Sequence, residues 1–77
     1  MRKPQKSEAE LRAMILERIR EHPVCPATMD VSVRAAHLSW IVDCMPPNGQ
    51  HIAYADCCNL ITKIAAELRL EYRLAPN

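Results

Sequence analysis

The feature that most constrains the fold is a change in the spacing of apolar residues along the chain. Leu11, Ile15 and Ile19 recur every four residues, which is the spacing of one face of an α-helix. From Met29 the apolar residues alternate with polar ones, which is typical of a β-strand with one buried face. Helical spacing returns in the last third of the chain. The sequence therefore predicts the order helix, strand, strand, helix.

The first helix has clear signals at both ends. Ser7 and Glu10 have the spacing of a capping box, in which each side chain bonds the backbone N–H of the other residue. Pro23 stops a helix and disfavours helical angles at the residue before it. We therefore predict a helix over residues 8–22. Residues 1–6 are predicted to be a flexible basic tail, and residues 7–75 a single domain.

The two alternating runs, residues 28–34 and 38–44, predict an antiparallel hairpin with one buried face. A two-residue turn at Ala35-Ala36 would ask two alanines for positive φ, at about 1–2 kcal/mol each. A four-residue loop over residues 35–38 instead sets Asp30 opposite Asp43, at about 0.2–1 kcal/mol. The four-residue loop is favoured, and it pairs Val33 with Trp40. A three-residue loop without a bulge would break the alternation of faces.

The second helix is predicted to begin between Asn48 and Tyr54 and to present one apolar face. The residues on that face are Tyr54, Cys57, Cys58, Ile61, Ile64, Ala65, Leu68 and Tyr72. The predicted fold is a small single α+β domain of order α-β-β-α, with two helices packed on one face of the antiparallel hairpin. A two-stranded sheet has two edges, and each can pair with another chain.

The charge balance argues against several classes of partner. Ten basic and nine acidic residues give a net charge of +1, so no strong field attracts nucleic acid or a membrane surface. The stretch of residues 35–44, which includes Asp43, is too short and too polar to cross a bilayer. No apolar segment follows the first residues, so no secretion signal is expected and a cytoplasmic location is predicted.

The four cysteines lack the spacing of a zinc site. Successive cysteines are 19, 13 and 1 residues apart, and no C-x2-C pair occurs. In a reducing cytosol they are expected to be reduced residues that pack as small hydrophobes. A metal site that recruits histidines and a disulfide or redox role remain as alternatives. Cys25, Cys57 and Cys58 form the candidate thiol site, because a bridge from Cys25 to either neighbour would join the connector to the second helix.

No catalytic or cofactor motif is present. The chain has no phosphate-binding loop, no G-x-S-x-G and no H-E-x-x-H, so we expect neither an enzyme nor a cofactor. A pair formed by His51 with Cys57 or Cys58 would need a third orienting group, which no spacing requires. Asp30 and Asp43 are interpreted as solvated surface residues.

Contact with another copy of the chain, or with an unknown protein partner, fits the predicted fold best. Edge-to-edge pairing of two hairpins would give a homodimer with a four-stranded sheet. The partner-contact surface is assigned to Ser39, Ile41 and Asp43 on the solvent-facing side of the hairpin. The alternative is a weak nucleic-acid-binding accessory protein that uses its basic tail. A thiol redox or metal-binding role is the third hypothesis.

Overall fold

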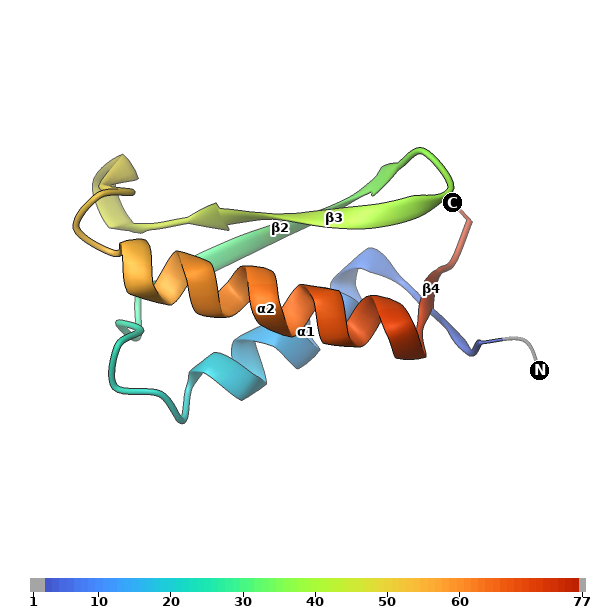
Figure 1. The fold of residues 1–77 in the computed structure, drawn as a ribbon, viewed down its shortest axis with the longest axis horizontal. Coiled ribbons are helices and arrows are strands. Elements are labelled where there is room, and N and C mark those ends of the chain that lie inside the picture. The colour runs from blue at the N-terminus through green and yellow to red at the C-terminus, as the bar shows by residue number, and fades with distance from the viewer. Residues whose placement is uncertain (1–2, 77) are drawn as a thin grey trace.

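The structure, a computed structural model, describes residues 3–76 and has the predicted fold (Figure 1). Two helices and an antiparallel hairpin follow one another in the order α-β-β-α, so the predicted α+β class is confirmed. Two short strands and a 3-10 turn add to this order. The elements are β1 (Gln5–Lys6), α1 (Glu8–Ile19), β2 (Asp30–Ala36), β3 (Ser39–Met45), η1 (Pro47–Gly49), α2 (Ala55–Glu71) and β4 (Arg73–Leu74).

Helix α1 begins with the predicted capping box. The Ser7 hydroxyl accepts from the Glu10 N–H at 3.1 Å, and the Glu10 carboxylate accepts from the Ser7 N–H at 3.0 Å. The bond from the Ser7 backbone N–H lowers the pKa of Glu10. The helix ends at Ile19, three residues before the predicted end. The helix ends before Pro23 because the His22 N–H donates to the Ile19 carbonyl and forms a tight turn there.

The hairpin has a register that the sequence analysis did not consider. Ala36 pairs with Ser39, so the turn consists of His37 and Leu38 and both predicted loops are wrong. His37 takes a φ of 51°, and Leu38 has no positive φ. Histidine is among the non-glycine residues that are enriched at positive φ. This turn is less costly than the Ala35-Ala36 turn, and it sets Asp43 opposite Ser32 instead of Asp30.

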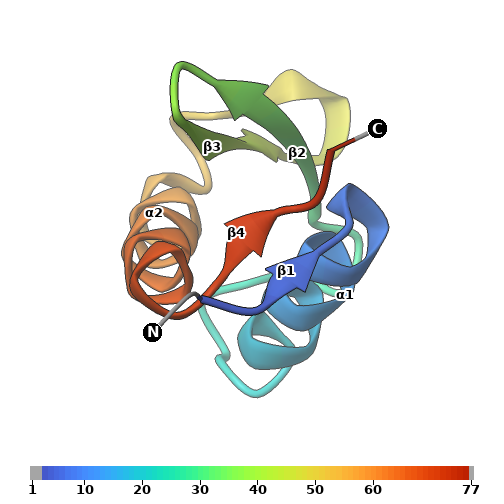
Figure 2. The same cartoon turned by 90° about the vertical axis from the view of Figure 1, so that its right-hand side faces the viewer.

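The alternation of faces is nevertheless as predicted, because the observed register keeps the same parity. Both helices lie on the buried face of the hairpin, with α1 against β2 and α2 against β3. Figure 2 shows the helices side by side beneath the two strands. Trp40, which is 1% exposed, is among the largest fully buried side chains. The core comprises Leu11, Ile15, Ile19, Met29, Val31, Val33, Trp40, Cys57, Ile61, Ile64, Ala65 and Leu68.

The segment predicted as a flexible tail is partly built into the fold. Gln5 and Lys6 form β1, which pairs in parallel with β4 and crosses one end of the molecule (Figure 2). The Arg73 N–H donates to the Pro4 carbonyl at 2.9 Å, and the Ala75 N–H donates to the Lys6 carbonyl at 2.8 Å. Residues 1 and 2 of the predicted tail lie outside the described residues. Residues 3–6 therefore belong to the folded unit.

Helix α2 begins at Ala55, one residue after the predicted window, with Tyr54 at its N-cap. Its buried side chains match the predicted apolar face, and Cys57 is fully buried. Arg18 of α1 and Glu67 of α2 form an ion pair at 3.4 Å between the two helices. Over residues 3–76, no helix combines the length and the apolar character that a membrane span requires.

Candidate functional site

The predicted partner-contact surface lies on the outer face of β3. Ser39 and Asp43 are exposed, and Ile41 between them is half-buried. The Asp43 carboxylate accepts from Arg34 Nε at 2.9 Å, across the two strands. Both helices pack against the opposite face of the hairpin, so these three side chains share one helix-free face (Figure 1).

The register decides which backbone groups point away from the hairpin. Ala36 and Ser39 flank a two-residue turn, so their N–H and C=O groups bond each other. Successive residues then point alternately toward the partner strand and away from it. The residues whose backbone groups point outward are Val31, Val33 and Ala35 in β2 and Trp40, Val42 and Cys44 in β3. These positions are the two edges of the sheet.

The β3 edge is blocked near both of its ends. The Trp40 carbonyl accepts from Arg69 Nη1 at 3.4 Å, and the Arg69 guanidinium lies over the Trp40 ring at 5.6 Å from its centroid. At the other end, His51 Nε2 lies 3.2 Å from the Cys44 carbonyl. His51 Nδ1 lies 3.2 Å from the Gly49 carbonyl, and a neutral imidazole can donate to only one of these oxygens. Only Val42 is left between the two blocked positions.

The β2 edge is blocked at its first outward position alone. The Val31 carbonyl accepts from Arg12 Nε at 3.3 Å, and the Val31 N–H donates to the Asp30 carboxylate at 2.8 Å. Arg12 also pairs with Asp30 at 2.7 Å, which fixes both blocking groups. The next two outward-pointing positions of β2, Val33 and Ala35, have no side-chain contact of this kind to their backbone groups within residues 3–76. We call the segment Val33–Ala35 the open edge.

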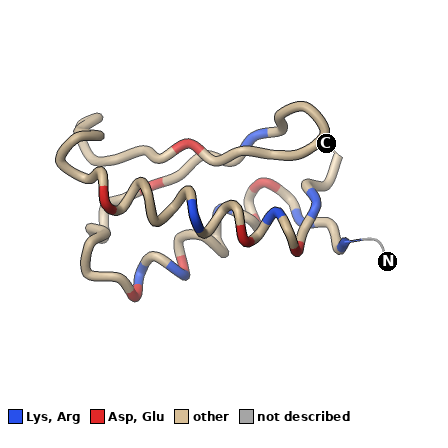
Figure 3. Tube along the Cα trace, viewed as in Figure 1, with Lys and Arg blue, Asp and Glu red and all other residues tan. Residues whose placement is uncertain are grey.

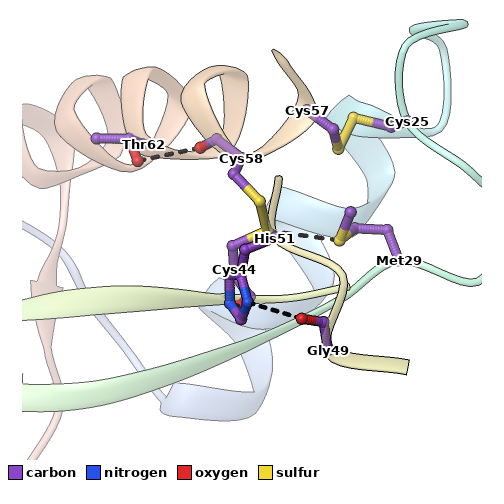
Figure 4. Close-up of a disulfide and its surroundings, with 8 residues drawn as sticks. All are labelled: Cys25, Met29, Cys44, Gly49, His51, Cys57, Cys58 and Thr62. Atoms are coloured by element: carbon purple, nitrogen blue, oxygen red, sulfur yellow. Dashed lines mark hydrogen bonds between the residues drawn. A yellow bond between two sulfur atoms is a disulfide. The ribbon is translucent and has the colours of Figure 1, made fainter. Parts of the chain in front are cut away.

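The structure pairs all four cysteines, which corrects the expectation that they are reduced. Disulfides join Cys25 to Cys57 and Cys44 to Cys58 (Figure 4). The Cα atoms are 5.0 Å apart in the first pair and 5.6 Å apart in the second, within the range that disulfides require. Neighbouring residues of a helix are rotated by about 100°, so Cys57 and Cys58 point to different partners. The candidate bridge from Cys25 to α2 is therefore present, and Cys44 joins the cysteine site.

The disulfides were not predicted because the expectation of reduced cysteines was based on a reducing cytosol and not on the geometry of the fold. The first disulfide ties the connector between α1 and β2 to α2, and the second ties the end of β3 to the same helix. Cys44 Sγ also contacts Met29 Sδ at 3.5 Å. Paired sulfurs carry no proton, so in this state none of the cysteines is a nucleophile. Within residues 3–76, no cluster of three histidine, cysteine, aspartate or glutamate residues is arranged to hold a metal ion.

Comparison of the chain with family models, with curated proteins and with solved structures gives no match. The edge-blocking roles of Arg12, His51 and Arg69 were not predicted from the sequence, where His51 was considered only as a partner of a cysteine. Their position on helices or loops gives no signal, because their role depends on the hairpin register. With the correct turn, the outward carbonyls of Val31, Trp40 and Cys44 could have been named in advance, but their donors could not.

Proposed function

We propose that this chain is a non-catalytic domain that works by pairing with a second copy of itself through the open edge of β2. The single observation that carries this proposal is the difference between the edges. Side chains block both ends of the β3 edge, whereas two successive outward positions of β2 have no such block. Native proteins cover or blunt their sheet edges, and an unblunted edge is a template for another strand.

One register of the dimer uses the open edge fully. A two-fold axis at Arg34 pairs Val33 of each copy with Ala35 of the other, which gives four N–H···O bonds across the axis. The two Arg34 side chains then lie opposite each other, and each keeps the bond to its own Asp43. This arrangement joins the outer faces that carry Ser39, Ile41 and Asp43 into one four-stranded surface. An unknown protein partner that adds a strand would use the same groups.

The expected affinity is modest. Four backbone bonds contribute about 4 kcal/mol, and apolar burial must offset the lost translational and rotational freedom, so we expect a dissociation constant on the order of 1 mM. Sedimentation equilibrium up to about 1 mM protein therefore covers the range. We expect the average mass to rise from the 8.8 kDa of one chain toward twice that value. A mass of one chain throughout this range contradicts self-association.

A matched pair of proline variants tests which edge is used. Ala35→Pro removes an N–H that points outward from β2, so it leaves the bonds between β2 and β3 intact. Val42→Pro removes an outward N–H from β3 in the same way. We expect Ala35→Pro to abolish the dimer and Val42→Pro to retain it. Loss of the dimer in Val42→Pro alone would assign self-association to the β3 edge and overturn the proposal.

The predicted cytoplasmic location is part of this proposal only if the cysteines are reduced in the cell. Structural disulfides are typical of oxidising compartments and rare in the cytosol, so the two bridges weigh against that location. Trapping thiols with a maleimide in intact cells distinguishes the cases. Four labelled thiols per chain would support a reduced cytosolic protein, and no labelling would support an oxidising compartment.

A further inference from the structure

A groove lies at the end of the molecule where the hairpin turn meets the two chain ends. Its volume is about 710 Å³, and its lining comes from the hairpin turn, the end of α2 and β4. A volume of several hundred Å³ is typical of a binding site. We call it the end groove and define it by Lys3, Trp40, Arg69, Tyr72, Arg73 and Leu74.

The end groove is basic although the chain is nearly neutral. Three of its lining residues, Lys3, Arg69 and Arg73, are cationic, and no aspartate or glutamate lines it. Blue positions in Figure 3 mark basic residues near both termini, and the acidic positions nearby lie on the helices. Within residues 3–76, Arg12, Arg18, Arg20 and Arg34 each pair with a carboxylate, whereas Arg69 and Arg73 do not. The groove thus concentrates cations that lack carboxylate partners in the described chain.

Existing bonds hold two of these cations in place. Lys3 Nζ donates to the Arg69 carbonyl at 3.0 Å, and the Arg69 guanidinium lies over Trp40. Trp40 Nε1 donates to the Tyr72 carbonyl at 3.3 Å, which anchors β4 to the hairpin. Since Arg73 and Ala75 donate to the β1 segment, the alternation along β4 turns the Leu74 N–H away from β1, toward the side that faces Trp40. A backbone donor and two cations therefore flank the same space.

We propose that the end groove binds an acidic peptide segment with alternating carboxylate and apolar side chains. A carboxylate would accept from Arg73 and the Leu74 N–H, and charge-assisted bonds of this kind are the strong ones. The apolar side chain would contact Leu74 and Leu38, and Leu38 is fully exposed at the turn. Trp40 is too buried to stack on a base, and this disfavours single-stranded nucleic acid as the occupant. Ala35 lines the groove and also lies on the open edge, so the two proposals share this residue and the groove is tested where the dimer is dissociated.

Trp40 is the only tryptophan of the chain, so its fluorescence reports on the groove. The probe is the peptide acetyl-Glu-Leu-Glu-Leu-amide, titrated at micromolar protein, where the weak dimer is dissociated. We expect a saturable change in emission that is lost when both glutamates of the probe are replaced by glutamine. Arg73→Gln should weaken binding about tenfold, as expected for one charge-assisted bond. Lys63→Gln removes an exposed charge outside the groove and should leave binding unchanged.

Four results would overturn the proposal. The first is the absence of a saturable change with the acidic peptide up to millimolar concentration. The second is equal binding of the glutamine peptide, which would show that the carboxylates contribute nothing. The third is equal weakening by Arg73→Gln and Lys63→Gln, which would show only a general charge effect. Displacement of the peptide by an oligothymidine at equimolar concentration would assign the groove to nucleic acid instead.

Discussion

The two edges of the hairpin are protected by different means. The β3 edge meets Arg69 at one end and His51 at the other, and the Cys44–Cys58 bridge ties it to α2. Among residues 3–76, the β2 edge meets only Arg12 and Asp30, at its first outward position. A two-stranded sheet is marginal alone and needs both its face and its edges covered. The comparison teaches that this small domain covers one face of the hairpin with both helices and protects the two edges unequally.

The largest expected effects come from removing the disulfides one at a time. Cys25→Ala/Cys57→Ala opens a link between residues 32 apart and should cost about 4 kcal/mol of unfolding free energy. Cys44→Ala/Cys58→Ala opens a link between residues 14 apart and should cost about 3 kcal/mol. Urea unfolding at 10 °C measures both. Only the second variant should also accelerate amide exchange at Asp43, whose N–H points toward Ser32 of β2, because only that bridge ties the end of β3 to α2.

Equal acceleration of Asp43 exchange in both double variants would contradict this assignment. It would mean that the bridges stabilise the domain as a whole and that the β3 edge owes nothing special to Cys44. Both effects are large against the few kcal/mol that a core of this size provides.

Arg69→Met should open the β3 edge directly. The substitution removes the bond to the Trp40 carbonyl and the contact over the Trp40 ring, and should cost about 1–2 kcal/mol. It should also strengthen self-association, because the β3 edge gains an outward carbonyl. Sedimentation equilibrium of the variant measures the association. Weaker association than in the unmodified chain would show that Arg69 does not protect the edge.

Ser7→Ala should lower the stability of the domain without changing the protection of either sheet edge. It removes the capping hydroxyl of α1 and should cost about 1 kcal/mol, without changing either edge. The lowered pKa of Glu10 gives the sign of the pH effect. A carboxylate with a depressed folded-state pKa contributes stability above its unfolded pKa, and this contribution is lost as pH falls through the folded value. Thermal melts in acid should therefore show a smaller acid-dependent loss for the variant, and an unchanged association constant at neutral pH.

The smallest effect is expected from Arg12→Met, which extends the open edge by one position. The ion pair with Asp30 is about half exposed, so its loss should cost about 0.5 kcal/mol. The freed Val31 carbonyl should then strengthen the dimer slightly. If Arg12→Met weakens the dimer, Arg12 is part of the interface and not a block at its border.

The periodicity of the sequence predicted the helices, the strands and the buried faces, because burial of an apolar face depends only on spacing. Met29, Val31, Val33 and Trp40 are buried as the alternation predicts. The hairpin register was predicted wrongly because it depends on one backbone angle, the positive φ of His37, which the sequence does not indicate. Residues 5–6 and 73–74 carry no strand pattern of their own, and pairing across the chain ends makes them strands.

The candidate site likewise has features that the sequence predicted and contacts that it did not. The position of Ser39, Ile41 and Asp43 on the helix-free face followed from the alternation of a strand, and the divergence of Cys57 from Cys58 followed from the rotation of about 100° per residue of a helix. The pairing of Cys44 with Cys58 required knowledge of how the end of β3 lies against α2. The end groove arises where Lys3, Arg69 and Arg73 meet, and these residues are separated by most of the chain. Contacts between distant segments are therefore what the sequence could not supply.

Amide hydrogen exchange as a function of protein concentration tests the central claim most directly. The account predicts that the amides of Val33 and Ala35 exchange rapidly in dilute solution and become protected as the concentration rises toward about 1 mM, while the Val42 amide does not change. Protection that rises at Val42 alone, or exchange at Val33 and Ala35 that is independent of concentration, would contradict it.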